Sequence, residues 1–465
     1  MLLNFGIVDG LPEEEQEKLN KLKYIYDYHK SSNRKKRRYY NGKITLKEVN
    51  LGIALPRDFG RLEIGCAWGA KAVDVLAARS MFDGFVMQNG SDASEMDQIM
   101  KRNRLVAEYS KACKEELKYG SVYAAVSGSE GKACIRFYSP MCAAASWDNQ
   151  KGTIDCGFAF EDLRTDESDY NWSPSHVNFY TDTDIWQLDM EGGRWKATQY
   201  PHKFRRPLMV PMIWDATNDK PLGQSRLKEP IRRLIQGYVR TVANATIGLE
   251  FATSPQKYLL GITDEQYDAL VEQRFKQYVG SILFSTTNPE SGEKPTYGQL
   301  NQGNIEPHVQ MLRMIATQFS AATGLTVTDT GVVNDANPTS SDAILAQSQT
   351  LVLMAQQLNT GNADALYQIS QMALAIELGT TPDDLPYECK EIVAHFKNPA
   401  MPSVAVTADA AIKIASARDG FSSTDTFLEM IGFDQADIRR IKAQEQRARG
   451  ARILTEEFTA NEDIE

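Results

Sequence analysis

Residues 221–261, PLGQSRLKEPIRRLIQGYVRTVANATIGLEFATSPQKYLLG, contain a long helical pattern that runs into a proline. Apolar residues recur at spacings of three and four between residues 225 and 250, at Ile231, Leu234, Ile235, Tyr238, Val242 and Ala245. This spacing predicts a helix with one buried face, a rod of roughly 30 Å. Pro230 is compatible with its first turn, and Pro255 follows its end.

Three arginines recur every seven residues on another face of this pattern, namely Arg226, Arg233 and Arg240. In a monomer, such a row of cations would be exposed to water.

A second helix is predicted from Asn304, whose side chain can cap it, to Gly324, which suits a left-handed helix stop. Val309, Leu312, Ile315 and Phe319 would form its inner face. Small and turn-forming residues follow, and a long helix restarts near residue 340. No charge lies between Asp342 and Asp364, which predicts that this helix packs against protein on most sides.

The part before residue 215 alternates helical and strand-like patterns. Residues 66–83 and 94–119 read as helices that end at Gly84 and Gly120. Strand patterns follow in SVYAAVSG, KACIRFYSP, IDCGFAFED, HVNFYTDTDIWQLD and RWKATQY. The chain is therefore predicted to be an α+β protein with a helical C-terminal part.

Composition excludes several classes of protein. The chain has 465 residues, 42% hydrophobic and 24% charged, with a net charge of −10. This balance predicts a folded protein and argues against a broad basic face that grips nucleic acid. The six cysteines include no C-x-x-C pair, so we expect reduced, structural thiols in a cytoplasm. No segment is apolar enough over its length to span a membrane, and the first ten residues resemble no secretory signal.

Enzyme signatures are missing from the sequence. GSEGKA carries Gly131 and Lys132 but has Val126 and Ala133 where a phosphate-binding loop needs glycine and a hydroxyl, so we predict a hairpin turn. Asp182, Asp184 and Asp189 could hold a metal in a nucleic-acid-processing enzyme, although a solvated strand face explains them as well. No cofactor or metal site is predicted.

The order of several short phrases resembles a known family. RRYYNGK, ALPRDF, AVDVLAARSMFDGF, LKYGSVYAAV, FYSPMCAAASWD, PLGQSRL, GLEFATSPQKYLLG, NPTSSDAI and ADAAIKIASARDGFSSTDTFLEMIGFDQADIRRI occur in this order. Together they resemble the portal proteins, or head–tail connectors, of long-tailed phages of Gram-positive hosts. The similarity covers most of the chain and thins in residues 160–200 and after 450.

The resemblance implies a portal-type fold with an α/β wing, two long stem helices, a small α/β clip, a tunnel loop and a helical crown. By order along the chain, the parts would be the wing at 1–222, the stem helices at 223–253 and 304–324, the clip at 254–303, the tunnel loop at 325–339, a long helix with a return to the wing at 340–399, the crown at 400–450, and an acidic flexible tail at 451–465.

The resemblance also implies a function and partners. Subunits would form a ring, typically a dodecamer, at one capsid vertex of the virion, after assembly in the host cytoplasm. Double-stranded DNA would pass through the channel during packaging and ejection. Large terminase, major capsid protein, scaffold protein and head-completion or adaptor proteins would bind the ring, and no membrane or cofactor would take part.

Three groups of residues would carry these contacts. The DNA tunnel loop would use Gly331, Val332, Val333, Asn334, Asp335 and Asn337. The stem contact between subunits would use Arg226, Arg233 and Arg240. The clip contact with terminase or adaptor would use Glu290, Glu293, Lys294 and Tyr297. The alternatives are another virion structural protein, such as a minor head or adaptor protein, and the metal-dependent enzyme.

Overall fold

The computed structural model describes eleven stretches of the chain. They are residues 4–45, 64–87, 94–129, 131–162, 174–253, 257–260, 296–299, 304–331, 341–400, 404–433 and 435–462. The sequence also predicts a helix at 264–277 and a strand in GSILFST, and both lie outside these residues.

Helix α1 (Glu13–Tyr40) forms as its charge pattern predicts. Three glutamates occupy its first turn, and Arg37 and Arg38 occupy its last, an arrangement that the helix dipole favours. The chain leaves the helix at Asn41, and Gly42 adopts a left-handed backbone with φ +69°. The helix packs its buried Leu19, Leu22 and Tyr26 against the sheets behind it.

Two antiparallel sheets form the centre of the body. The smaller has the order β3-β2-β9, and the larger has the order β4-β5-β6-β7-β8. Their strands are β2 (Ser121–Ser129), β3 (Lys132–Tyr138), β4 (Ala143–Asp148), β5 (Thr153–Phe160), β6 (His176–Tyr180), β7 (Asp184–Glu191), β8 (Arg194–Pro201) and β9 (Met209–Ile213). Ser129 pairs with Lys132 where β2 turns into β3, so the hairpin predicted at GSEGKA is confirmed.

Two features of the expected helices are wrong. The helix predicted over 66–83 is shorter, α3 (Trp68–Arg79), and Gly84 does not stop it. Gly84 instead lies in β1 (Phe82–Met87), which pairs with the distant β12 (Ile392–Phe396) and has an irregular register at this glycine. The helix predicted over 94–119 is two helices, α4 (Ser94–Asn103) and α5 (Leu105–Tyr119), because Arg104 adopts a left-handed backbone with φ 50°. Gly120 ends α5 as predicted.

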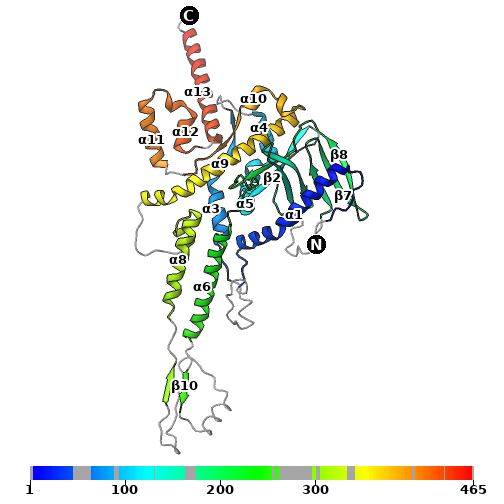
Figure 1. The fold of residues 1–465 in the computed structure, drawn as a ribbon. Coiled ribbons are helices and arrows are strands. Elements are labelled where there is room, and N and C mark those ends of the chain that lie inside the picture. Colours follow the sequence, from blue (N-terminus) through cyan, green and yellow to red (C-terminus); the bar gives the residue numbers. More distant parts are fainter. Residues whose placement is uncertain are drawn as a thin grey trace, which may run out of the picture.

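Two long helices project side by side from the body, and a pair of short strands lies beyond them (Figure 1). The helices are α6 (Glu229–Thr253) and α8 (Glu306–Thr323). The strands β10 (Lys257–Leu260) and β11 (Thr296–Gln299) pair antiparallel. Both predicted helices are thus confirmed, and the Asn304 side chain accepts a hydrogen bond from the backbone N–H of Glu306 at 2.9 Å, as its capping role requires.

The buried face of α6 is turned slightly from the predicted one. Ile231, Ile235, Val239 and Ala243, spaced by four, are buried, whereas Leu234, Tyr238, Val242 and Ala245 are only partly buried. On α8 the buried residues are Ile315, Ala316, Phe319 and Thr323. The two helices therefore pack mainly through their halves nearest the body.

Helix α9 (Ser341–Glu377) crosses the body beside the sheets as one continuous rod (Figure 1). It packs on β2, β3, β9, β12 and α3. After it come η4 (Pro382–Asp384), α10 (Tyr387–Lys390), α11 (Val404–Ala417), η5 (Phe421–Ser423), α12 (Asp425–Ile431) and α13 (Gln435–Glu462). Among the described helices, none combines the length and apolarity that crossing a membrane requires.

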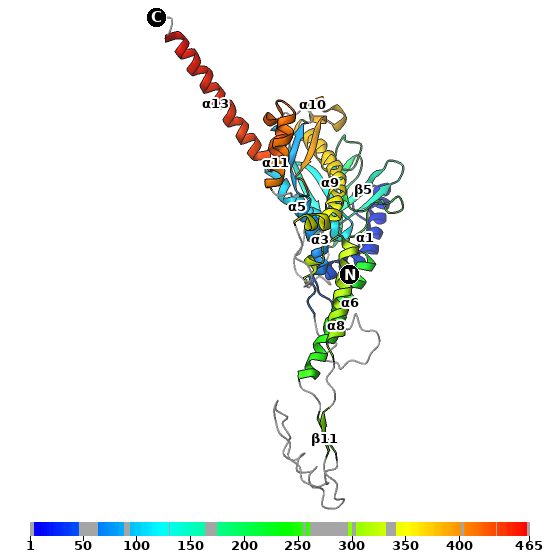
Figure 2. The ribbon, with the colours of Figure 1, turned by 90° about the vertical axis from the view of Figure 1, so that its left-hand side faces the viewer.

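Helix α13 extends away from the body (Figure 2) and continues to Glu462. From residue 451, where the sequence predicts an acidic flexible tail, the chain is helical as far as Glu462.

The cysteines behave as expected of structural thiols. Five are buried, Cys134 is partly buried, and no disulfide joins any of the six, all of which lie in described stretches. Burial raises the pKa of Cys66 to about 11 and that of Cys142 to about 12. Thiols with such pKa values are poor nucleophiles near neutral pH.

Candidate functional site

The two long helices join the body at a site built from five elements. The start of α6, the end of α8, the first turns of α3, the turn η3 (Thr328–Thr330) and helix α9 meet there. We call this region the stem joint. Its inner residues are Trp68, Arg226, Tyr238, Phe319 and Thr323.

Arg226 links three of these elements and is 5% exposed. Its guanidinium donates hydrogen bonds to the backbone oxygens of Ala72 in α3 and Thr323 in α8. A third nitrogen lies 3.5 Å from the sulfur of Met354 in α9. Burial lowers the pKa of Arg226 to about 10, so it still carries its charge at neutral pH, beside the negative end of the α8 dipole.

Trp68, the first residue of α3, fills the space between the two long helices. Its ring centroid lies 4.4 Å from that of Tyr238 in α6 and 4.7 Å from that of Phe319 in α8. Its indole N–H donates to the backbone oxygen of Thr330 at 3.1 Å. The aromatic stack therefore contacts both helices and the η3 turn at once.

The chain between α8 and η3 is held by its own polar side chains. Gly324 ends α8 with φ +69°, and the Ser320 hydroxyl donates to the backbone oxygen of Leu325 at 2.6 Å. The Asp329 carboxylate accepts from the backbone N–H of Thr326 at 2.9 Å and from its hydroxyl at 2.8 Å. The η3 turn is thus a small rigid unit.

The structure corrects one predicted stem contact. Arg226 was expected to reach a neighbouring subunit, but it lies three residues before α6 begins and its side chain is buried inside its own chain. The heptad spacing with Arg233 and Arg240 therefore does not place the three arginines on one helix face. Arg233 is exposed and pairs with Glu229 at 2.9 Å, and Arg240 is partly buried.

Most of the other predicted contact residues lie outside the described residues. These are Val332, Val333, Asn334, Asp335 and Asn337 of the tunnel loop and Glu290, Glu293 and Lys294 of the clip. Gly331 is described, and it ends η3 with φ +80°. Tyr297 lies in β11, where its backbone pairs with that of Leu259.

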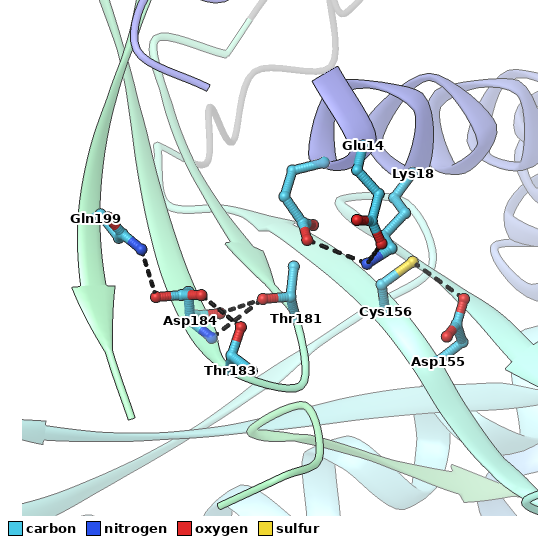
Figure 3. A network of polar contacts seen from close by, with 9 residues as sticks. Glu14, Lys18, Asp155, Cys156, Thr181, Thr183, Asp184 and Gln199 are labelled. Atoms are coloured by element: carbon cyan, nitrogen blue, oxygen red, sulfur yellow. Dashed lines mark hydrogen bonds and ion pairs between the residues drawn. The ribbon is translucent and has the colours of Figure 1, made fainter. Parts of the chain in front are cut away.

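Two of the three carboxylates of the enzyme alternative, Asp184 and Asp189, are engaged by other residues, and Figure 3 shows the contacts of Asp184. Asp184 accepts a hydrogen bond from Gln199 at 2.8 Å and contacts the Thr183 hydroxyl. The same view contains the start of α1, where Lys18 pairs with two glutamates. Asp189 pairs with His176 at 2.7 Å. Across the described stretches, no group of three or more His, Cys, Asp or Glu side chains is arranged to hold a metal ion.

A buried polar cluster between α5 and α9 escaped the sequence prediction. Glu116 is fully buried, and one of its carboxyl oxygens accepts from the amide nitrogen of Asn362 at 2.9 Å. The same nitrogen donates to the Tyr109 hydroxyl at 3.0 Å, which contacts the Ser80 hydroxyl at 2.6 Å. Burial raises the pKa of Glu116 to about 8. The one available signal was an asparagine within a long helix that carries few charges.

Comparison with known proteins gives a consistent answer. Residues 19–451 match the family described as phage portal protein, SPP1 Gp6-like. The portal protein of Mycobacterium phage D29 is 21% identical over 415 residues, which cover 87% of this chain and 84% of that protein.

Solved structures with a similar fold come from gene transfer agent (GTA) particles. The virion of the native particle and its neck, computed with C12 symmetry, each give a TM-score of 0.47 at 15% identity. Each match covers 79% of this chain and 89% of the other. Since the family match spans nearly all of the sequence, the chain belongs to the SPP1 Gp6-like family of phage portal proteins.

Proposed function

We propose that copies of this chain form a closed ring at one capsid vertex of a phage virion and that double-stranded DNA passes through the ring. The family match over residues 19–451 carries this proposal. The architecture is compatible with it, because two long helices leave an α/β body side by side and a strand pair lies beyond them (Figure 1).

The order of parts in portal proteins suggests a role for each part of this chain. The body before residue 222 would be the wing, α6 and α8 the stem, residues 254–303 the clip, residues 325–339 the tunnel loop, and the helices of residues 400–450 the crown. The clip, with Glu290, Glu293, Lys294 and Tyr297, would bind terminase and later head-completion proteins. Major capsid and scaffold proteins would bind the ring during assembly in the host cytoplasm.

Passage of DNA requires contacts that do not hold it. Each phosphate that a lysine or arginine neutralises strengthens binding and makes it more dependent on salt. A subunit with a net charge of −10 and a tunnel loop rich in valine and asparagine suits weak contact that ignores base sequence. We propose that the subunit performs no catalysis and that a separate terminase supplies the energy.

Imaging tests the proposal directly. The purified protein, examined by negative-stain electron microscopy and by light scattering, is expected to form rings with a central hole, most simply of twelve copies. Particles that keep the 52.0 kDa mass of one chain at every protein and salt concentration would overturn the proposal.

Charge reversal on α6 tests the proposed contact between subunits. Arg233 is largely exposed, and it pairs with Glu229 of its own chain, an ion pair that is weak at a surface. Arg240 lies seven residues further along α6 and is partly buried. We expect the double variant Arg233→Glu, Arg240→Glu to raise the concentration for half-assembly by about tenfold or more, which corresponds to about 1.4 kcal/mol.

Light scattering against concentration measures this effect, and salt provides a second check. Raising the salt concentration should shrink the difference, because exposed charges are screened. The matched control reverses two exposed cations on the other side of the fold, Arg194→Glu and Lys203→Glu, and should assemble as wild type does. Equal assembly of both double variants would contradict a role for these stem arginines.

A further inference from the structure

Trp68 contacts three separate elements through one side chain. It is 4% exposed and lies at the first turn of α3. Its ring packs on Tyr238 and Phe319, one from each long helix, while its N–H is bonded to Thr330 in the η3 turn. A change in the distance between the helices must therefore act on the group that holds the turn.

The backbone of α3 is held at two points close to Trp68. Gly69, the next residue, lies so close to α1 that a Cβ atom there would be 2.1 Å from the backbone oxygen of Tyr39. The Ala72 oxygen, one turn further, is bonded to Arg226. With its backbone held at both points, rotation of the ring is the least hindered response of Trp68 to movement of the long helices.

Within the described residues, the hydrogen bonds of the η3 turn, apart from the one from Trp68, are confined to its own segment, residues 326–331. Its ladder consists of three backbone bonds, Asp329 N–H to Thr326, Thr330 N–H to Val327 and Gly331 N–H to Thr328, all of 3.1 Å. Asp329 ties the turn to Thr326 of the same segment. The turn therefore moves as a unit with the carbonyl that Trp68 holds.

We propose that Trp68 is a positioning residue that couples the spacing of α6 and α8 to the position of the η3 turn. Packed interiors respond to strain by switching between arrangements rather than by stretching, so a wedge between two helices transmits their separation efficiently. The coupling stands without the proposed function. Its consequence, that the stem sets the position of the segment entering the tunnel loop, rests on that function.

The competing explanation is that Trp68 only fills the core. Trp195 in β8 provides a matched control, because it is also buried, with 2% of its surface exposed. Its indole N–H donates to the backbone oxygen of Asn4, a residue far away in the sequence, at 3.2 Å. Trp68→Phe and Trp195→Phe each keep an aromatic ring and lose one indole-to-carbonyl hydrogen bond. A purely structural role predicts that the two variants behave alike.

Hydrogen exchange followed by mass spectrometry, on the assembled protein without DNA, separates these explanations. Trp68→Phe is expected to speed exchange of the amides of Asp329, Thr330 and Gly331 by about tenfold, the factor expected when one hydrogen bond is lost. Exchange within α6 and α8 should stay unchanged. Trp195→Phe should leave the η3 amides as in wild type.

A second substitution tests the coupling itself. Phe319→Leu replaces the aromatic ring on α8 that contacts the indole of Trp68 by a smaller side chain, and so alters the contact between α8 and Trp68. We expect it to speed exchange at η3 by several fold when Trp68 is present and by much less in the Trp68→Phe background, since linked sites are not additive.

Two results would overturn the proposal. One is an equal effect of Phe319→Leu on η3 in both backgrounds. The other is η3 exchange in Trp68→Phe that does not exceed that in Trp195→Phe. Either result leaves ring formation untouched, so a failure here is distinguishable from a failure of the proposed function, which imaging decides.

Discussion

Replacing Arg226 by methionine is expected to lower the free energy of unfolding by about 2–4 kcal/mol, since hydrogen bonds from a charged group contribute about 1.5–3 kcal/mol each. Methionine keeps much of the apolar length of the side chain but removes the bonds to Ala72 and Thr323. The Ala72 oxygen lies inside α3 and retains its helical partner. The Thr323 oxygen lies at the end of α8, where helix carbonyls lack such partners. Loss of the hydrogen bond to Thr323 therefore accounts for most of the expected destabilisation.

Desolvation opposes this loss. Burial lowers the pKa of Arg226 to about 10, which shows that its charge is held at a cost. No carboxylate partner is found for it in the described part of the chain, and removing the arginine therefore leaves no orphaned acid behind. We expect the bonds to outweigh the cost because they join the segment that leads into α6 to α3 and α8, which lie far from it in the sequence.

Urea unfolding followed by tryptophan fluorescence measures the change. Arg232→Met is the matched control: Arg232 also makes two hydrogen bonds, but both partners are local, since Glu229 begins its own helix and Leu227 lies two residues before it. We expect it to cost about 1 kcal/mol, as for a local bond. Arg226→Lys should fall between the two, because one ammonium does not span both carbonyls. An Arg226→Met protein as stable as wild type would show that desolvation cancels the bonds.

Local signals account for the parts of the fold that the sequence predicted. The boundaries of α1, α6 and α8 follow from charges at helix ends, a proline in a first turn and glycines that adopt left-handed backbone. These determinants act within a few residues, so reading them needs no knowledge of the rest of the chain. The β2–β3 hairpin was predictable for the same reason.

Contacts between distant segments account for the failures. Gly84 reads locally as a helix stop, yet β12, more than 300 residues later, makes its segment a strand. The spacing of Arg226 suggested a helix face, but the helix begins after it, and α8 and α3 decide that it is buried. Such burial is set by tertiary packing, which one sequence does not display.

The stem joint shows the same limit within the candidate site. The sequence predicted both long helices, but it assigned no role to Trp68. Its importance arises because residues 68, 238, 319 and 330 meet in space. The arginines that did attract notice, Arg233 and Arg240, remain predictions about a neighbouring subunit.

Replacing Glu116 by glutamine is expected to stabilise the protein increasingly as pH rises from about 5 to about 8. Burial raises the pKa of Glu116 in the folded protein to about 8, from 4.5 for an ordinary glutamate. Below 4.5 the carboxyl is protonated in both states, and the wild type bears no penalty. Between the two values the unfolded chain releases the proton and the folded chain keeps it, so stability falls as pH rises. Above 8 both states are ionised and the penalty is constant.

The difference between variant and wild type isolates this group from the other titrations of the chain. The stability difference should grow across this pH window and level off at several kcal/mol, at most about 5. Each unit by which the pKa differs between the folded and unfolded states corresponds to about 1.4 kcal/mol. The neighbouring Tyr109 and Cys113 do not confuse the measurement. Burial raises the pKa of both far into the alkaline range, so they stay neutral while Glu116 titrates.

Two measurements check the prediction. Urea unfolding at a series of pH values gives the stability difference, with Glu108→Gln as control, since Glu108 lies on the same helix but pairs with the exposed Lys111. Infrared spectroscopy of the folded protein should show a protonated carboxyl band near neutral pH that fades above pH 8 and is missing in Glu116→Gln. The amide oxygen of the substituted side chain can still accept from Asn362, so the cluster keeps its hydrogen bond. A stability difference that stays flat between pH 5 and 8 would mean that Glu116 is ionised in the folded protein and that the surrounding dipoles compensate for its burial.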